Sequence, residues 1–511
     1  MTTATLGDRG RSTPGGDSPG LAPFNRRPVL GIAAGLVVLE LAVAARYGYH
    51  RDELYFLACA RHLAWGYVDQ PPFVPAVARL STAWFGPSVV ALRLFPALAG
   101  GATVVFTALM ARELGGSRRA QALAALAAAT SAQVLATVHL LSTAAFDLFF
   151  WSAIILLVTH LLRTQNRRVW LAVGAVAGVG LLNKYNVAFL LFGLAVGLIL
   201  TGRGRELNSP WPWAGAAVAL VIWSPNLIWN AEHHWAALTM LRSLHQENST
   251  LGASITFIPS QVVLAGPVLL PIWFGGLRHL LRHPFARALG LAYIVLLVLD
   301  TLVGAKPYYL GGIYFVLFAA GGIWLDQRLT ARRRSGATAR VVAWILAGAL
   351  VALPLVLPVL PVTSLAKGPW EGKINKDLSA TVGWRQFVAQ VAGVAATLPP
   401  AERAHVVIFT GDYGAAGAID LFGPHDHLPH AISGHNTYWL WGPAGATDGA
   451  TTIAVDLSQS YLETIFGQVT PASTVDTGHG VWTEERGDPI WICRQQKLPW
   501  AQVWPDARHY G

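Results

Sequence analysis

Long apolar runs separated by short polar connections dominate the chain from residue 28 to residue 361. A bilayer core about 30 Å thick requires about twenty apolar residues for each crossing helix, and somewhat fewer where a bundle buries the helix ends. On this criterion the pattern predicts about eleven membrane-spanning helices. Their predicted limits are 28–46, 89–111, 119–137, 142–162, 169–182, 186–201, 212–229, 255–277, 287–303, 308–325 and 340–361.

The two ends of the chain have a different pattern. Residues 1–27 are rich in Gly, Pro, Ser and Thr and have no apolar face, which predicts a disordered tail. The run that follows lacks a small-residue cleavage site, so we expect an uncleaved first span and not a signal peptide. Residues 362–511 have the composition of a soluble domain, with β-like runs HVVIFTGDYG, TTIAVDL and PIWICR. These runs predict a small C-terminal α/β domain.

Composition and charge agree with a multi-pass α-helical membrane protein. Charged residues make up 13% of the chain and apolar residues 53%, whereas about a quarter of an ordinary soluble domain is charged. Arginines occupy every second connection, at 112–119, 163–168, 203–205, 278–287 and 328–340. The positive-inside rule therefore places the N-terminus in the cytoplasm and the C-terminal domain outside. The net charge of +10 reflects this topology. The sequence has no basic patch interleaved with aromatic residues, so we do not expect a nucleic acid partner.

The first outer connection, residues 47–88, is long and mixes amphipathic spacing with acidic residues, which predicts helices lying along the membrane interface. Asp52 and Glu53 are adjacent in it, and a helix places them on different faces about 100° apart. One carboxylate can then accept a proton while the other binds a metal, a basic residue or a backbone donor. Asp69 precedes a double proline that fixes an extended turn. The alternative, in which all three acids lie on a solvated loop face, stays open.

The order of residues in this loop, DELYFLACARHLAWGYVDQPP, resembles the first-loop signature of the polyprenyl-phosphate-sugar-dependent GT-C glycosyltransferases. Within that class it is similar to the branch of protein O-mannosyltransferases and lipid A aminoarabinose transferases. The resemblance continues through STAAFDLFFW, GLLNKYN, PNLIWNAEHHW, AKPYYLGGIYFVLFAAGG, YGAAGAIDLFGP and SGHNTYWLWGP. It implies a GT-C-like bundle, a polyprenyl-phosphate-linked sugar donor and a hydroxyl acceptor on a lipid, glycan or protein.

The resemblance also implies roles for the loop carboxylates. Asp52 is then the catalytic base, which takes a proton from the acceptor hydroxyl. We also expect Glu53 to belong to the catalytic site. Asp69 is implied to bind a divalent metal together with a histidine, for which we favour His245. The alternatives are His139, His233, His234 and no metal at all, because no compact ligand spacing is present.

Two cations that bracket the donor phosphate in the aminoarabinose transferases are missing, because Tyr55 and Gln70 stand at the matching positions. Lys184 and Lys306 lie at outer ends of spans, where an uncompensated ammonium is costly, so we expect them to balance the phosphate charge. Snorkelling at a helix end is the alternative for both lysines. The other expected donor-binding residues are Asp147, Tyr308 and Tyr309, although interfacial tyrosines are also common in membrane belts.

These features predict an inverting hexosyl- or pentosyltransferase of the bacterial plasma membrane that transfers a mannose- or arabinose-type sugar. A polytopic transporter or flippase for lipid-linked sugars and a non-catalytic accessory subunit that binds them are the alternatives. Transporters usually have paired halves with matching broken helices, and the chain has no such repeat. Cys59 and Cys493 both fall on the predicted outer side, and we expect free thiols, with a disulfide as the alternative.

Overall fold

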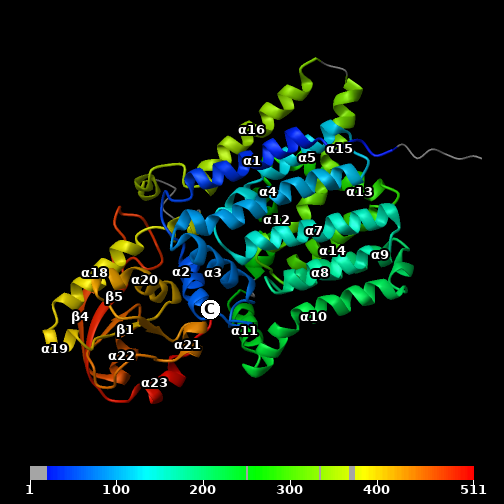
Figure 1. The fold of residues 1–511 in the computed structure, drawn as a ribbon. Coiled ribbons are helices and arrows are strands. Elements are labelled where there is room, and N and C mark those ends of the chain that lie inside the picture. The colour runs from blue at the N-terminus through cyan, green and yellow to red at the C-terminus, as the bar shows by residue number, and fades with distance from the viewer. Residues whose placement is uncertain (1–19, 249–250, 333–334, 368–374) are drawn as a thin grey trace, which may run out of the picture.

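The computed structural model describes residues 20–248, 251–332, 335–367 and 375–511, except for the side chains of residues 244–248, 251–253 and 332. A bundle of helices forms the first two thirds, and a smaller α/β domain packs against one end of it (Figure 1). We call this end the domain end of the bundle. Residues 1–19 of the predicted cytoplasmic tail lie outside the described residues.

Each predicted span coincides with a helix or with two consecutive helices. The bundle helices are α1 (Arg26–Val43), α4 (Val89–Glu113), α5 (Arg118–Thr130), α6 (Ala132–Val138), α7 (Thr143–Thr164), α8 (Val169–Leu181), α9 (Val187–Leu200), α10 (Pro210–Glu232), α12 (Leu251–Ala265), α13 (Leu270–Arg282), α14 (Arg287–Leu302), α15 (Tyr314–Arg332) and α16 (Ala337–Val356). Among the described residues, five helices are long and apolar enough to cross a membrane, or up to seven if each bent pair forms one span. The protein is therefore a multi-pass helical membrane protein, and the count of about eleven spans stays a prediction.

Two predicted continuous spans are broken. The span predicted at 119–137 bends by 57° between α5 and α6, and the one at 255–277 bends by 82° between α12 and α13. Gly266 stands at the second break with a φ of 93°, a conformation that favours glycine, and Pro267 follows it. The apolar pattern alone does not show these bends because both halves of each span are apolar.

Small residues allow the helices to approach closely. A Cβ atom built on Gly174 of α8 would lie 2.0 Å from the carbonyl oxygen of Gly215 in α10. The two backbones therefore touch, and any side chain at this crossing would separate the helices.

The C-terminal domain contains a mixed five-stranded sheet in the order β2-β1-β3-β5-β4. The strands are β1 (Val407–Thr410), β2 (Ala431–Ser433), β3 (Thr452–Val455), β4 (Phe466–Thr474) and β5 (Pro489–Gln496). Strands β2, β1 and β3 are parallel, whereas β5 pairs antiparallel with both β3 and β4. The three predicted strands are confirmed as β1, β3 and β5. The sequence analysis missed β2, which is short, and β4, which is mostly exposed and polar.

The connection at residues 47–88 forms two helices, α2 (Arg51–Arg61) and α3 (Phe73–Phe85), as the amphipathic spacing predicted. Helix α2 lies between the bundle and the C-terminal domain, however, and not along an open membrane surface (Figure 1). It packs on α20 (Tyr413–Phe422), where a Cβ atom on Gly417 would lie 2.8 Å from the backbone carbonyl carbon of Leu54. Both cysteines are free and buried, Cys59 in α2 and Cys493 in β5, as expected.

Candidate active site

A capping box fixes the first turn of α2, where the two adjacent carboxylates lie. The backbone N–H of Asp52 donates to Nδ1 of His50 at 3.1 Å, and the backbone N–H of His50 donates to the Glu53 carboxylate at 2.8 Å. These bonds satisfy donors that a helix N-terminus would otherwise leave free. The first turn is therefore held rigidly, with Asp52 and Glu53 on different faces.

Glu53 is fully buried and its carboxylate is saturated. It accepts two hydrogen bonds from the Arg93 guanidinium, at 2.9 and 2.7 Å, and one from the backbone N–H of Leu141 at 3.0 Å. A buried carboxylate requires this degree of pairing. The sequence left three roles open for the second carboxylate: binding a metal, a basic residue or a backbone donor. In the structure, Glu53 binds a basic residue and backbone donors. Glu53 therefore holds α2 in place, and no lone pair is left for a substrate.

The pairing continues into the bundle. Nη1 of Arg93 lies 3.2 Å from Nε2 of His139, and Nδ1 of His139 lies 3.1 Å from a carboxylate oxygen of Glu40 in α1. All four side chains are buried. We call Glu40, Glu53, Arg93 and His139 the anchor network. His139, one of the alternative metal ligands, is engaged in this network and is not close to Asp69.

Asp52 is arranged differently from its neighbour. Its side chain keeps 39% exposure, and its Oδ1 accepts a hydrogen bond of 2.8 Å from the hydroxyl of Tyr413 at the start of α20. Its Oδ2 lies 3.9 Å from Nδ1 of His50. The carboxylate is therefore oriented by its partners while still able to accept a further hydrogen bond.

Asp69 lies beside Asp52 and is held by Tyr55. The Tyr55 hydroxyl donates to Oδ1 of Asp69 at 2.7 Å and lies 2.6 Å from Oγ1 of Thr437 in the C-terminal domain. Asp69 keeps exposed surface, yet crowding by the protein removes enough of its hydration to raise its pKa to about 6. The Tyr55 hydrogen bond opposes this shift, and the negative charge of Asp52 adds to it. Tyr55 is fully buried, and its hydroxyl fixes the position of Asp69.

Lys184, Tyr308 and Tyr309, which were expected to bind the donor, lie next to one another in the helical bundle. Nζ of Lys184 lies over the rings of Tyr308 and Tyr309, 4.7 and 4.4 Å from their centroids. Burial lowers the pKa of Lys184 to about 8, with Asp147 opposing the shift and Lys306 adding to it. Tyr308 is also close enough to Asp52 to interact with it electrostatically. We call Asp52, Asp69, Lys184, Tyr308 and Tyr309 the open cluster.

Asp147 and Gln70 contribute buried polar atoms near this cluster. Oδ2 of Asp147 accepts from Asn186 at 2.8 Å, and Asn186 also donates to the carbonyl oxygen of Tyr309 at 3.1 Å. The other carboxylate oxygen of Asp147 has no hydrogen-bond partner, and neither does either side-chain polar atom of Gln70, among the described residues. Buried polar groups are rarely left in this state, so both are available to a ligand.

The C-terminal domain supplies site residues to which the sequence analysis assigned no role. Asp412 and Tyr413 directly follow β1, and His435 follows β2, so they share the carboxyl edge of the parallel strands, where ligands commonly bind. His435 lies 3.4 Å from Asp412, and the Tyr413 and His435 rings are 4.7 Å apart. Their signal in the sequence is the pair of motifs YGAAGAIDLFGP and SGHNTYWLWGP, which carry the resemblance without indicating function.

A divalent metal bound by Asp69 and a histidine stays a prediction. The described residues contain no group of three or more His, Cys, Asp or Glu side chains that could hold a metal ion. The side chain of His245 lies outside the described residues, and His233 stacks on Trp229 with ring centroids 4.0 Å apart. The histidine that acts electrostatically on Asp69 is His435, which was not expected. We therefore derive no step through a metal.

Comparison with known proteins agrees with this architecture. Residues 69–229 match the sequence profile of the dolichyl-phosphate-mannose-protein mannosyltransferase family. The lipid A galacturonosyltransferase RgtD of Rhizobium johnstonii is 28% identical over 233 residues, which is 43% of this chain and 46% of RgtD. The match thus spans about half the length of that relative.

Solved structures of ArnT from Cupriavidus metallidurans have a similar fold. The apo structure superposes with a TM-score of 0.62 at 15% identity, and the structure bound to undecaprenyl phosphate with 0.61 at 16%. Each covers 91% of this chain and 97% of ArnT. The resemblance drawn from the sequence is confirmed: residues 69–229 match the mannosyltransferase family profile, and the chain has a fold similar to that of ArnT along most of its length.

Proposed function

We propose that this chain is an inverting glycosyltransferase that moves a sugar from a polyprenyl-phosphate carrier to a hydroxyl acceptor at the outer face of the bacterial plasma membrane. The observation that carries the proposal is the arrangement of Asp52. This carboxylate is rigidly held on α2, is open on one side, and lies near the lysine and tyrosines of the open cluster.

The chemistry follows from this arrangement. Asp52 accepts the proton of the acceptor hydroxyl while the hydroxyl oxygen forms a bond to the anomeric carbon of the sugar. The bond between that carbon and the phosphate oxygen breaks, and its electron pair leaves with the carrier as polyprenyl phosphate. Lys184 and the neighbouring Lys306 balance the charge of the phosphate. One displacement from the opposite side inverts the anomeric carbon.

Tyr413 orients the base in this scheme. Its hydroxyl occupies one lone pair of Oδ1 of Asp52, so the remaining lone pairs point to the place where the acceptor must bind. Because Tyr413 belongs to the C-terminal domain, that domain completes the site and does not only cover it. Asp69, held by Tyr55, borders the same space.

The proposed acceptor and sugar classes rest on the chemistry of the site and on the similarity to RgtD. RgtD is named for a lipid acceptor, which favours a lipid over a glycan or a protein here. The transferred group is a hexose or pentose of the mannose or arabinose type. The N-terminus lies in the cytoplasm in this scheme, and the C-terminal domain lies outside.

The test is transfer by the purified full-length chain in proteoliposomes, supplied with a panel of radiolabelled polyprenyl-phosphate sugars and a lipid extract as acceptor. Wild-type protein should release polyprenyl phosphate and give a product of inverted anomeric configuration. Asp52→Asn should reduce transfer by roughly 10²–10⁴-fold without changing the thermal unfolding midpoint. Full activity of Asp52→Asn would overturn the assignment of the base.

The same assay separates the alternatives. A flippase would move labelled donor across the bilayer with no glycosyl transfer, and Asp52→Asn would leave that movement intact. An accessory subunit would bind the donor without releasing polyprenyl phosphate. Either result would overturn the proposed enzyme.

A further inference from the structure

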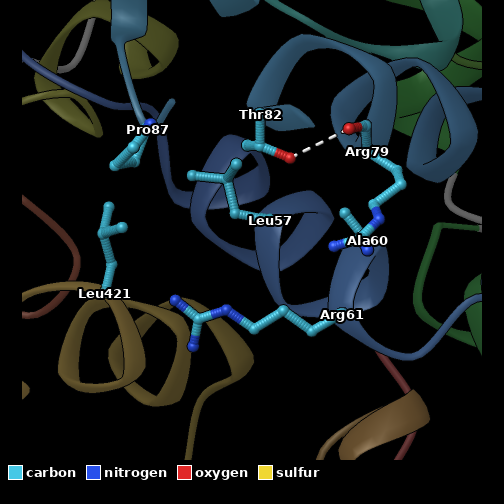
Figure 2. A pocket seen from close by; sticks show the side chains of 7 residues that line it. All are labelled: Leu57, Ala60, Arg61, Arg79, Thr82, Pro87 and Leu421. Atoms are coloured by element: carbon cyan, nitrogen blue, oxygen red, sulfur yellow. Dashed lines mark hydrogen bonds between the residues drawn. The ribbon is translucent and has the colours of Figure 1, made fainter. Parts of the chain in front are cut away.

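A pocket outside the open cluster lies between α2, α3 and α20 at the domain end of the bundle (Figure 2). Its volume is about 200 Å³, and it opens to solvent. The lining residues include Leu57 and Arg61 of α2, Arg79 and Thr82 of α3, Pro87, and Leu421 of α20.

Helix α2 separates this pocket from the open cluster. At about 100° per residue, Leu57 and Arg61 project from the side of α2 roughly opposite to Asp52 and Tyr55. The pocket therefore shares no side chain with the proposed catalytic arrangement. A ligand bound in it is distinct from the sugar donor.

Both charged side chains that line the pocket are positive. Figure 2 shows Arg61 and Arg79 reaching into the pocket from neighbouring helices. Arg61 donates to the carbonyl oxygen of Asp420 at 3.1 Å, and Arg79 has no ion-pair partner among the described residues. The Asp420 carboxylate is itself occupied by the hydroxyl of Tyr438, at 2.8 Å, and by His430, at 3.1 Å. Two guanidinium groups beside one apolar-walled pocket favour an anion.

The surroundings favour a position of the pocket at the level of lipid headgroups. Leu80, Trp84 and Phe85 of α3 are exposed by 37%, 67% and 53%, respectively. Aromatic residues of this kind are enriched where a membrane protein meets the interface. Helix α4, a candidate span, begins four residues after Phe85, at Val89. The mouth of the pocket is thus next to the membrane boundary.

We propose that this pocket binds the phosphate of an anionic lipid headgroup. Arg61 and Arg79 donate charge-assisted hydrogen bonds to the phosphate oxygens, and the apolar wall of Leu57, Pro87 and Leu421 contacts the carbon atoms next to the phosphate. The exposed face of α3 contacts the adjoining acyl region. The site goes beyond the proposed transfer reaction, because it would bind lipid even in the Asp52→Asn variant.

The experiment measures binding of dioctanoyl phosphatidylglycerol to the full-length protein in a neutral detergent by native mass spectrometry. The double variant R61Q/R79Q should weaken the tightest site at least tenfold. The control R242Q removes an exposed arginine of α11 (Ala236–Asn248) outside the pocket and should bind as the wild type does. Thr82→Trp, which fills the pocket without removing charge, should weaken binding as the double variant does. Unfolding midpoints show whether each variant is folded.

Several outcomes would overturn the proposal. One is equal binding by wild type and by folded R61Q/R79Q or Thr82→Trp. Another is an equal loss in R242Q, which would indicate a diffuse charge effect. A third is inorganic phosphate displacing the lipid at comparable concentration, which would make the pocket a site for soluble anions. Displacement by dioctanoyl phosphatidylcholine at the same concentration would exclude selectivity for net negative charge.

Discussion

The two carboxylates at the start of α2 are adjacent in sequence and opposite in environment. Glu53 belongs to the anchor network, where each of its oxygens is paired and no surface is exposed. Asp52 belongs to the open cluster, where one oxygen is oriented by Tyr413 and the side chain stays accessible. A carboxylate whose lone pairs are all occupied by donors fixes the position of its helix, whereas one with free lone pairs can accept a proton. The difference shows that two adjacent carboxylates of one short motif can have opposite environments, one saturated and one open.

Glu53→Gln removes the saturated carboxylate and should have the largest effect on stability. The amide keeps the shape but removes the carboxylate that pairs directly with the buried Arg93, which should cost about 3–5 kcal/mol of unfolding free energy. Thermal unfolding in detergent measures this loss, and Asp52→Asn is the matched control with an unchanged midpoint. Adding Arg93→Gln should recover part of the stability. If Glu53→Gln kept wild-type stability and lost transfer, Glu53 would act in the chemistry.

Lys184→Met tests the bundle side of the open cluster. Loss of one charge-assisted contact to the donor phosphate, worth about 1.5–3 kcal/mol, should raise KM for the polyprenyl-phosphate sugar about tenfold or more. The measurement is a donor titration at saturating acceptor. Lys497→Met, an exposed lysine of the C-terminal domain, is the control. An unchanged KM would mean that Lys184 only snorkels at a helix end.

Tyr413→Phe tests the contribution of the C-terminal domain to Asp52. Removal of one hydrogen bond, worth about 0.5–1.5 kcal/mol, should lower kcat by roughly 3- to 10-fold and leave KM for the donor unchanged. Tyr461→Phe is the control, because the Tyr461 hydroxyl has no hydrogen-bond partner among the described residues. Equal kcat values in both variants would contradict an orienting role for Tyr413.

The smallest expected effect is a pH dependence due to Asp69, because solvent around its exposed side chain screens the interactions behind the pKa shift. Its folded pKa of about 6 lies above its ordinary value of 3.8, so the folded state retains a proton that the unfolded state releases. Stability should therefore fall as pH rises from about 4 to about 6 and level off above that range. Asp69→Asn should lack this slope. Unfolding midpoints across the pH range provide the check, and parallel curves for both proteins would contradict the shift.

Much of the fold is predictable from sequence because apolar run length and charge alternation report directly on membrane crossing. The bend at Gly266 and the short strand β2 were missed, because both depend on local backbone geometry and not on hydropathy. For the site, Asp52 and Asp69 were expected from the loop motif and the resemblance, and Lys184 and the two tyrosines from their positions at the ends of spans. Tyr413 and His435 were not, because nothing local marks a side chain that acts on a helix more than 300 residues away in sequence.

Composition and periodicity are enough to predict the class of protein, the approximate positions of the helices and many of the residues available for chemistry. Which carboxylate is open and which is saturated depends on tertiary contacts. That outcome depends on Arg93 and Leu141 meeting Glu53 inside the bundle, and on Tyr413 reaching Asp52 from the C-terminal domain. The lone pairs of a carboxylate are occupied by the donors that the fold brings within hydrogen-bond distance. Donors that are distant in sequence reach this distance only when the chain has folded.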